Sequence, residues 1–178
     1  MSKFNLIPYD NTSHPSVSLE TEMNVTTDSV FISYKVTGDL ASVDLGTGSP
    51  KHARVIKLWE KTCFELFIKD SKGSYIEFNF SPEFEWNAFY FSKKGDPLTE
   101  YARVDSVKMD ILLSLEVFHL IVEVDKKKFP DGFFTSGELS AGITSVIKEK
   151  SGRISYWALS HEDTRPNFHH FDSFKYKF

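Results

Sequence analysis

Short stretches of alternating apolar and polar residues, each bounded by turn residues, recur along this chain and constrain its fold more than any other feature. The clearest case is residues 62–82, TCFELFIKDSKGSYIEFNFSP, in which two alternating runs flank the turn signal Asp-Ser-Lys-Gly. Because successive side chains of a strand point to opposite faces, this alternation predicts two strands, and the turn between them predicts a hairpin. Further strands are expected at 29–39, 86–97, 116–125, 138–150, 153–160 and 171–178.

Strands at this spacing, with Gly, Pro, Asp and Asn between them, predict an all-β fold, either a sandwich or a barrel. The 17 Phe, 7 Tyr and 3 Trp among the 178 residues agree with this prediction, since aromatic residues favour strands. A short helix or turn is expected before Thr62, and a long loop at 38–54. Neither a repeat nor a linker is visible, so residues 1–178 are predicted to form a single domain.

The charge and hydropathy of the chain exclude several classes of partner. Its formal net charge is −4, so no overall positive field attracts nucleic acid or anionic lipid. No run approaches the roughly 18 apolar residues of a membrane-spanning helix, and the first residues do not resemble a signal peptide. A cytoplasmic location is therefore expected, with neither nucleic acid nor membrane as partner. The single cysteine, Cys63, excludes an internal disulfide.

One face of the predicted hairpin carries an unusual set of polar side chains. Glu65, Glu77 and Asn79 point away from the predicted core, and the next strand is expected to add Trp86 and Tyr90 to them. This mixture suits a half-buried ligand surface, although a solvated face or a contact with another segment would also accommodate it. The predicted core residues are Phe64, Leu66, Ile68, Ile76, Phe78, Phe80, Leu120 and Val122.

The C-terminal segment, residues 156–178, is rich in aromatic and basic side chains, whereas a terminus is usually frayed and polar. A strand at its end would tie the segment down, and the loop before that strand would lie over the polar face. There His161, Arg165 and His169 are expected to supply hydrogen-bond donors. In this hypothesis His161 and His169 reach over Glu65, whose charge raises the pKa of a histidine, and binding changes between about pH 5 and 8.

Three blocks of the sequence resemble bacterial DOMON-like proteins, which are related to family 9 carbohydrate-binding modules. The blocks are LWEKTCFELFI at 58–68, YIEFNFSPEFEWNAFYF at 75–91 and YWALSHEDTRPNFHHFDSF at 156–174. The resemblance implies an antiparallel β-sandwich of jelly-roll type, a two-sheet architecture like that of immunoglobulin domains, that binds a sugar, or haem in some relatives. Sugar-binding relatives clamp the sugar between two tryptophans, and Trp59 and Trp157 lie in comparable blocks. The relatives also carry structural calcium, but its ligands do not map onto this sequence.

The predicted function is therefore non-catalytic binding of a carbohydrate or a similar polyhydroxylated small molecule, with no cofactor, metal or catalytic residue. A protein-interaction or structural domain is the main alternative, since surface Trp and Tyr suit either role. The candidate ligand-binding residues are Trp59, Glu65, Glu77, Asn79, Trp86, Trp157, His161, Arg165 and His169.

Other chemistries have less support in the sequence. Glu65 and Glu77 could form the carboxylate pair of a glycosidase, but a defined separation and a deep cleft are also required. Cys63 could pair with His161 as a thiol nucleophile, although a packing role suits a small buried cysteine better. The histidines lack a recognised metal-ligand spacing. The candidate haem ligands are Met23, Met109 and His119.

Overall fold

The computed structural model describes residues 2–47 and 51–178, and its regular elements there are eleven β-strands and five short 3-10 helices. The all-β prediction is thus confirmed. Within these residues no helix has the length and apolar character needed to cross a membrane. The strands are β1 Ser2–Pro8, β2 Val17–Val25, β3 Ser29–Gly38, β4 Cys63–Lys69, β5 Tyr75–Phe80, β6 Trp86–Phe91, β7 Lys108–Leu113, β8 Val117–Asp125, β9 Ser140–Lys148, β10 Ile154–Ala158 and β11 Tyr176–Lys177. The 3-10 helices are η1 Leu40–Ser42, η2 Leu58–Glu60, η3 Lys126–Lys128, η4 Phe133–Thr135 and η5 Phe171–Ser173.

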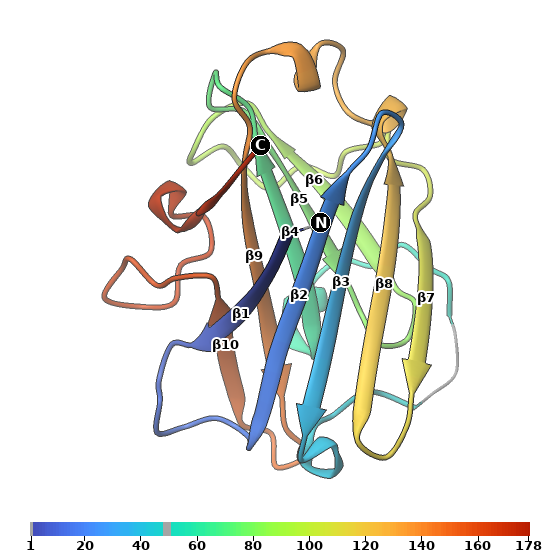
Figure 1. The fold of residues 1–178 in the computed structure, drawn as a ribbon, viewed down its shortest axis with the longest axis vertical. Coiled ribbons are helices and arrows are strands. Elements are labelled where there is room, and N and C mark those ends of the chain that lie inside the picture. Colours follow the sequence, from blue (N-terminus) through green and yellow to red (C-terminus); the bar gives the residue numbers. More distant parts are fainter. Residues whose placement is uncertain (1, 48–50) are drawn as a thin grey trace.

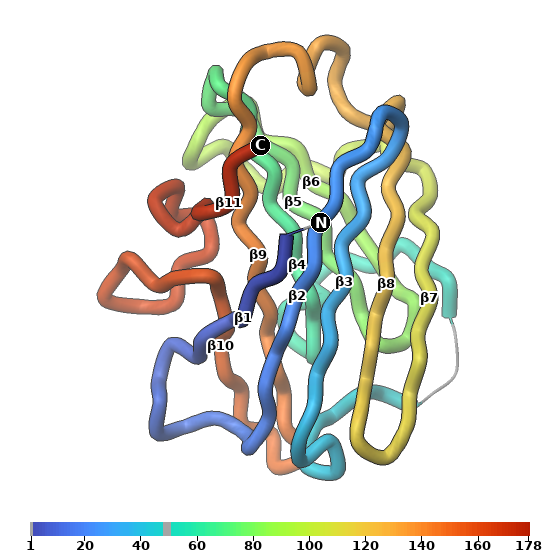
Figure 2. Tube along the Cα trace, in the orientation of Figure 1, coloured from blue at the N-terminus to red at the C-terminus, as the bar shows by residue number. Residues whose placement is uncertain are grey.

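The strands form two antiparallel layers, as the ribbon in Figure 1 shows. The β4 sheet has the strand order β6-β5-β4-β9-β10, and the β3 sheet has the order β2-β3-β8-β7. Strand β1 connects them, because its first residues pair with β2 whereas Ile7 and Pro8 pair with β10. Strand β11 pairs with Ser140 and Ala141 at the start of β9, next to which it runs in Figure 2. The prediction of an antiparallel β-sandwich is confirmed.

The core lies between the two sheets and is largely aromatic. The ring of Phe64 on β4 stacks on that of Phe118 on β8, with centroids 5.3 Å apart. The hydroxyl of Tyr34 on β3 crosses the core and donates a hydrogen bond of 2.7 Å to the backbone carbonyl of Glu65. Every residue of the predicted core is buried, namely Phe64, Leu66, Ile68, Ile76, Phe78, Phe80, Leu120 and Val122.

The predicted hairpin is formed by β4 and β5, and its turn is stabilised by the Asp70 side chain. The Asp70 carboxylate accepts hydrogen bonds from the backbone N–H groups of Lys72 and Ser74, both 2.9 Å long. Such side-chain caps explain why aspartate favours turns. The short helix expected before Thr62 is η2, and the strand expected within 138–150 is β9.

One expectation about a loop falls partly on residues that the structure does not describe, and one about the C-terminal strand differs from the structure. The long loop at 38–54 contains η1, and residues 48–50 lie outside the described residues. The strand predicted over 171–178 is shorter than expected, because only the two residues of β11 pair with β9. The preceding residues form η5, where a spacing of three brings Phe171 and Phe174 together with ring centroids 5.6 Å apart.

Strand β6 presents the opposite face from the one predicted. Trp86 pairs with Phe80 and Tyr90 pairs with Ile76, so Trp86 and Tyr90 share the core face of the β4 sheet. Both alternating sets of the sequence WNAFYF contain aromatic residues, so hydrophobicity alone could not choose between them. The register against β5 decides the face, since a shift of one residue would exchange the two sets.

Candidate functional site

The outer face of the β4 sheet, which points away from the core, carries the polar set predicted from the hairpin. Glu65 pairs directly with Asn79 across the ladder, and Phe67 pairs with Glu77. The prediction that Glu65, Glu77 and Asn79 share a face is confirmed. The side chains on this face are nevertheless buried, namely those of Glu65, Phe67, Glu77 and Asn79, so this is not a solvated face. A second apolar cluster lies on it, formed by Phe67, Tyr75, Phe89, Phe91 and Phe174 with Trp59, Phe168 and Phe171 at its border.

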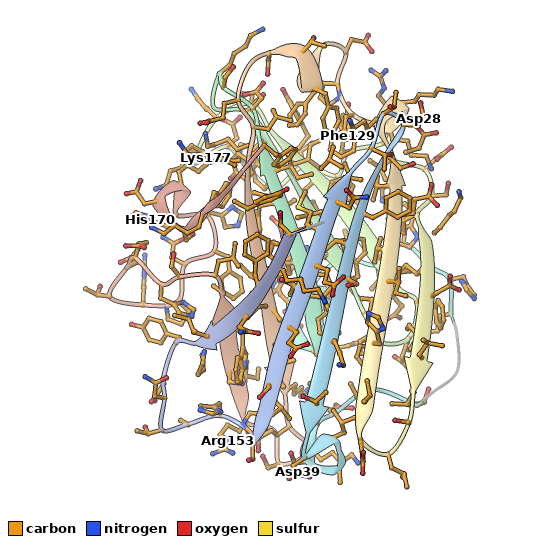
Figure 3. The ribbon with its side chains drawn as sticks, viewed as in Figure 1. Asp28, Asp39, Phe129, Arg153, His170 and Lys177 are labelled. Carbon is orange, nitrogen blue, oxygen red and sulfur yellow. The ribbon has the colours of Figure 1, made fainter. Side chains whose placement is uncertain are left out.

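The C-terminal segment buries this outer face. It follows β10 and returns to β9 along the flank of the sandwich on which Figure 3 labels His170. Phe174 packs directly on Gly142 of β9, where an added Cβ atom would lie 2.6 Å from the phenylalanine ring. Glycine at position 142 therefore allows the segment to approach the sheet closely.

A pocket of about 300 Å³ lies between the sheet and the C-terminal segment. This volume is at the lower end of the range for small-molecule sites. The sheet contributes buried carboxyl and aromatic side chains, and the segment contributes four consecutive residues that begin at Pro166. The lining residues are Trp59, Glu65, Phe67, Glu77, Leu98, Val146, Tyr156, Pro166, Asn167, Phe168 and His169.

Trp59 reaches the pocket because η2 is anchored on the outer face. Leu58, its neighbour in η2, is buried against Cys63 of β4 and Val146 of β9. The Trp59 ring meets Phe89 edge to face, with centroids 6.1 Å apart. An indole held in this way presents a fixed apolar plane to a ligand.

The two carboxyl groups in the pocket are buried side by side. Glu77 Oε1 accepts a hydrogen bond of 2.7 Å from the Asn79 amide, and Glu65 Oε2 accepts one of 3.1 Å from the Thr144 hydroxyl. Among the described residues, Glu77 Oε2 has no hydrogen-bond partner. Burial raises the pKa of both carboxyls, and the charge of Glu77 raises that of Glu65 further. At neutral pH the pair therefore retains a proton that exposed carboxyls would have lost.

His169 lies over Glu77 and is oriented by a tyrosine. The Tyr75 hydroxyl is hydrogen-bonded to His169 Nδ1 at 2.9 Å, and burial raises the pKa of that phenol, so it is neutral. The other ring nitrogen, Nε2, lies 3.6 Å from Glu77 Oε2. This separation is too long for a hydrogen bond. Burial, with a smaller contribution from Lys94, lowers the pKa of His169, so the predicted increase is wrong for this residue.

His161 and Arg165 do not reach the pocket as predicted. His161 Nε2 donates a hydrogen bond of 3.0 Å to the carbonyl of Ile7, and its ring meets Tyr9 edge to face. Burial lowers the pKa of His161 as well. The predicted surface shared by His161 and Glu65 is therefore wrong, since β1 holds this histidine. Arg165 is exposed. It comes directly before Pro166 in the sequence but does not line the pocket.

Trp86 and Trp157 are also absent from the pocket, because both belong to the core between the sheets. Trp157 is 2% exposed, and its indole N–H donates a hydrogen bond of 2.9 Å to the Ser155 hydroxyl. Trp59 and Trp157 thus lie on opposite faces of the β4 sheet. The clamp of two tryptophans implied by the resemblance does not form here.

Several lining residues were not predicted from the sequence. Tyr156 alternates with Trp157 along β10, so it would have been found if Trp157 had been assigned to the core. Asn167 and Phe168 belong to the segment already predicted to cover the polar face, but nothing in their spacing selects them over their neighbours. Leu98 belongs to the loop after β6 and carries no local signal.

The arrangement does not favour the chemistry of a glycosidase. Glu65 and Glu77 occupy diagonal positions on neighbouring strands and face the pocket from the same sheet. Hydrolysis requires carboxyl groups on both sides of the glycosidic bond, with the sugar between them. The proposed haem ligands Met23 and His119 are separated, since Met23 is buried in the core whereas His119 lines a hollow on the outer face of the β3 sheet. Within the described residues, no three His, Cys, Asp or Glu side chains are grouped to hold a metal ion.

Cys63 is expected to behave as a packing residue. It is fully buried below Asn79, and burial raises the pKa of its thiol, which disfavours the reactive thiolate. We expect iodoacetamide to modify the folded protein at pH 8 at least about a hundredfold more slowly than the unfolded protein, as measured by mass spectrometry. Equal rates in the two states would show that the thiol is accessible.

The comparisons with known proteins identify the fold. No family model matches this chain, and no curated protein matches its sequence. A protein from Bacteroides uniformis ATCC 8492, to which carbohydrate binding is attributed, has a crystal structure that matches with a TM-score of 0.73 and 14% identity. The match covers 98% of this chain and 84% of that protein.

A family 9 carbohydrate-binding module from Caldicellulosiruptor kristjanssonii matches with a TM-score of 0.53 in two complexes. The glucose complex is 8% identical and covers 83% of this chain and 69% of that chain. The cellotriose complex is 9% identical, with coverages of 88% and 71%. At these identities the likeness shows a shared β-sandwich fold.

Proposed function

We propose that this chain is a non-catalytic binding module for a carbohydrate or a similar polyhydroxylated small molecule. The observation that carries the proposal is the pocket under the C-terminal segment, which combines the indole of Trp59 with the buried polar groups of Glu77 and His169. The fold shared with modules that are complexed with glucose and cellotriose supports it.

The lining matches the two chemical properties of a sugar. The C–H face of a sugar ring packs against an aromatic plane, which Trp59, Tyr156 and Phe168 can provide. Its hydroxyl groups both donate and accept hydrogen bonds, and the Asn167 amide and the Glu77 carboxyl offer both kinds of partner. The volume of about 300 Å³ suits one or two sugar units better than a long chain.

Replacing Trp59 by alanine is expected to weaken binding at least about tenfold, because the pocket loses the aromatic plane of the indole. Binding would be measured by titration calorimetry and tryptophan fluorescence with glucose, cellotriose and a panel of other mono- and oligosaccharides. The wild type should show a saturable change with at least one sugar, and Trp59→Ala should lose the fluorescence response.

The matched control is Leu115→Ala, which removes an apolar side chain that is 96% exposed in the β7–β8 hairpin, far from the lining residues. This variant should bind like the wild type. If no sugar of the panel binds at millimolar concentration, or if Trp59→Ala binds as tightly as the wild type, the proposed function is wrong.

A further inference from the structure

Among the residues that the structure describes, none places a fixed positive charge beside the carboxyl pair in the pocket. Glu65 and Glu77 are 3% and 4% exposed, yet no lysine or arginine of the described residues forms an ion pair with either. Buried carboxylates are normally paired with a cation because an isolated charge is costly in an apolar environment. The pocket therefore holds either buried negative charge or the protons that neutralise it. The described residues do not place a lysine or arginine beside this charge.

The hydrogen-bond donors near the pair are already engaged. The Asn79 amide donates to Glu77 Oε1, the Thr144 hydroxyl donates to Glu65, and the Tyr75 hydroxyl is hydrogen-bonded to His169. Glu77 Oε2 is left without a partner although the Glu77 side chain is 95% buried, with 5% of its surface exposed. A buried acceptor in this state lacks a donor that a ligand can supply.

The titratable groups that face the pair do not supply the missing charge. Burial raises the pKa of the Cys63 thiol and of the Tyr75 phenol, so both are neutral at pH 7. Burial lowers the pKa of His169, so its imidazole is also mainly neutral. Lys94, whose charge contributes to the lowered pKa of this histidine, has its ammonium group 5.7 Å from the centre of the Phe171 ring.

We propose that the pocket binds a ligand that carries a protonated amine, in the simplest case an amino sugar, with its ammonium group at Glu65 and Glu77. This inference rests on the proposed sugar-binding function and narrows its ligand class. An ammonium group brings both the positive charge and the donors that the site lacks, whereas a hydroxyl brings one donor and no charge. The aromatic walls formed by Trp59, Phe67 and Phe168 also favour a cation over a neutral group.

Access to Glu77 Oε2 requires a movement of His169. The imidazole lies over this oxygen, but its side chain is 42% exposed and its hydrogen bond with Tyr75 fixes only Nδ1. Rotation of the ring toward solvent opens the oxygen to an ammonium group, and it breaks the hydrogen bond with Tyr75 and the edge contacts with Phe67 and Phe91. The packing of Phe174 on Gly142 of β9 holds the remainder of the segment in place.

The test compares three sugars of the same skeleton by titration calorimetry at about pH 7, where an amine that titrates like an α-amino group is mainly protonated. D-glucosamine carries the amine, D-glucose lacks it, and N-acetyl-D-glucosamine has the same nitrogen without a charge. We expect D-glucosamine to bind about 10- to 100-fold more tightly than D-glucose, because charge-assisted hydrogen bonds are the stronger ones. N-acetyl-D-glucosamine should bind no more tightly than D-glucose.

The variant Glu77→Gln should bring the ratio of the D-glucosamine and D-glucose affinities close to one, and Glu65→Gln should reduce it. Glu116→Gln is the control, since Glu116 is an exposed glutamate in the β7–β8 hairpin. Circular dichroism would verify that each variant is folded, and the wild-type comparison needs no variant. If D-glucose binds as tightly as D-glucosamine, this inference is wrong and the proposed function stands. If neither these three sugars nor any sugar of the panel described above binds, the proposed function itself is wrong.

Discussion

Replacing Glu65 and Glu77 together by glutamine is expected to remove a loss of about 2 kcal/mol in the free energy of unfolding between pH 7 and 8.5, and so to flatten its dependence on pH in that range. Burial raises the pKa of Glu77 to about 7, and burial together with the charge of Glu77 raises that of Glu65 to about 8. The folded wild type must therefore give up these protons and bury a negative charge at alkaline pH. Glutamine has the same shape and remains neutral.

The direction follows from the order of the pKa values. In the unfolded chain both carboxyls titrate near 4.5, so the folded state binds their protons more tightly. Their contribution to stability is complete below about pH 4.5 and is lost as the pH rises through 7 and 8. The wild type should accordingly become less stable between pH 7 and 8.5, whereas the double variant should not.

Other titratable groups change the free energy of unfolding mainly outside the range from pH 7 to 8.5. The lowered pKa values of His161 and His169 contribute stability above pH 6.5 that is lost at lower pH, so both histidines are neutral between pH 7 and 8.5. Lys51 lowers the pKa of Glu83 to about 2, which affects stability only in acid. Urea unfolding followed by circular dichroism at several pH values measures the effect, with Glu116→Gln as control. A wild-type stability that does not change from pH 7 to 8.5 would contradict the prediction.

Replacing Phe78 by alanine is expected to lower the free energy of unfolding by about 3–5 kcal/mol through lost burial and a residual cavity. Phe78 is fully buried at the centre of β5, and its ring lies 5.5 Å from Phe129 and 6.2 Å from Phe80, measured between centroids. The surrounding side chains cannot close a cavity of this size, because the core is densely packed.

The comparison variant for Phe78→Ala is Leu113→Ala, since Leu113 is 61% exposed at the end of β7. The free energy of unfolding of Leu113→Ala should fall by less than about 1 kcal/mol, because the loss of an exposed side chain leaves no cavity. Urea unfolding at one pH compares the two variants. A loss below about 1 kcal/mol for Phe78→Ala would mean that the ring does not lie in the core.

The hairpin of β4 and β5 was predictable because each of its faces has one chemical character. Phe64, Leu66 and Phe78 alternate with Glu65 and Glu77, so the period of two assigns every side chain to a face. The same rule failed at β6, where both alternating sets are aromatic. No strand was predicted over the residues of β1, β2 and β7 either.

The C-terminal segment was predicted to cover the polar face, and it does line the pocket, yet the histidine that reaches the carboxyl pair could not be selected. His161 and His169 have the same donors, and only their distant partners separate them. His161 is held by the carbonyl of Ile7 on β1, whereas His169 is held by the Tyr75 hydroxyl on β5. These contacts join residues more than 90 positions apart, which no local spacing encodes.

The sequence by itself determined that this protein has an all-β fold, and it determined which side chains of β4 and β5 leave the core. Both properties are local, because the steric preference of a strand for alternating faces acts between adjacent residues. Only the tertiary structure decided that Trp59 lines the pocket while Trp157 does not, and that the carboxyls of Glu65 and Glu77 retain a proton. Those properties depend on strand register and on the removal of water by a segment about 90 residues away, and water is removed only when the chain has folded.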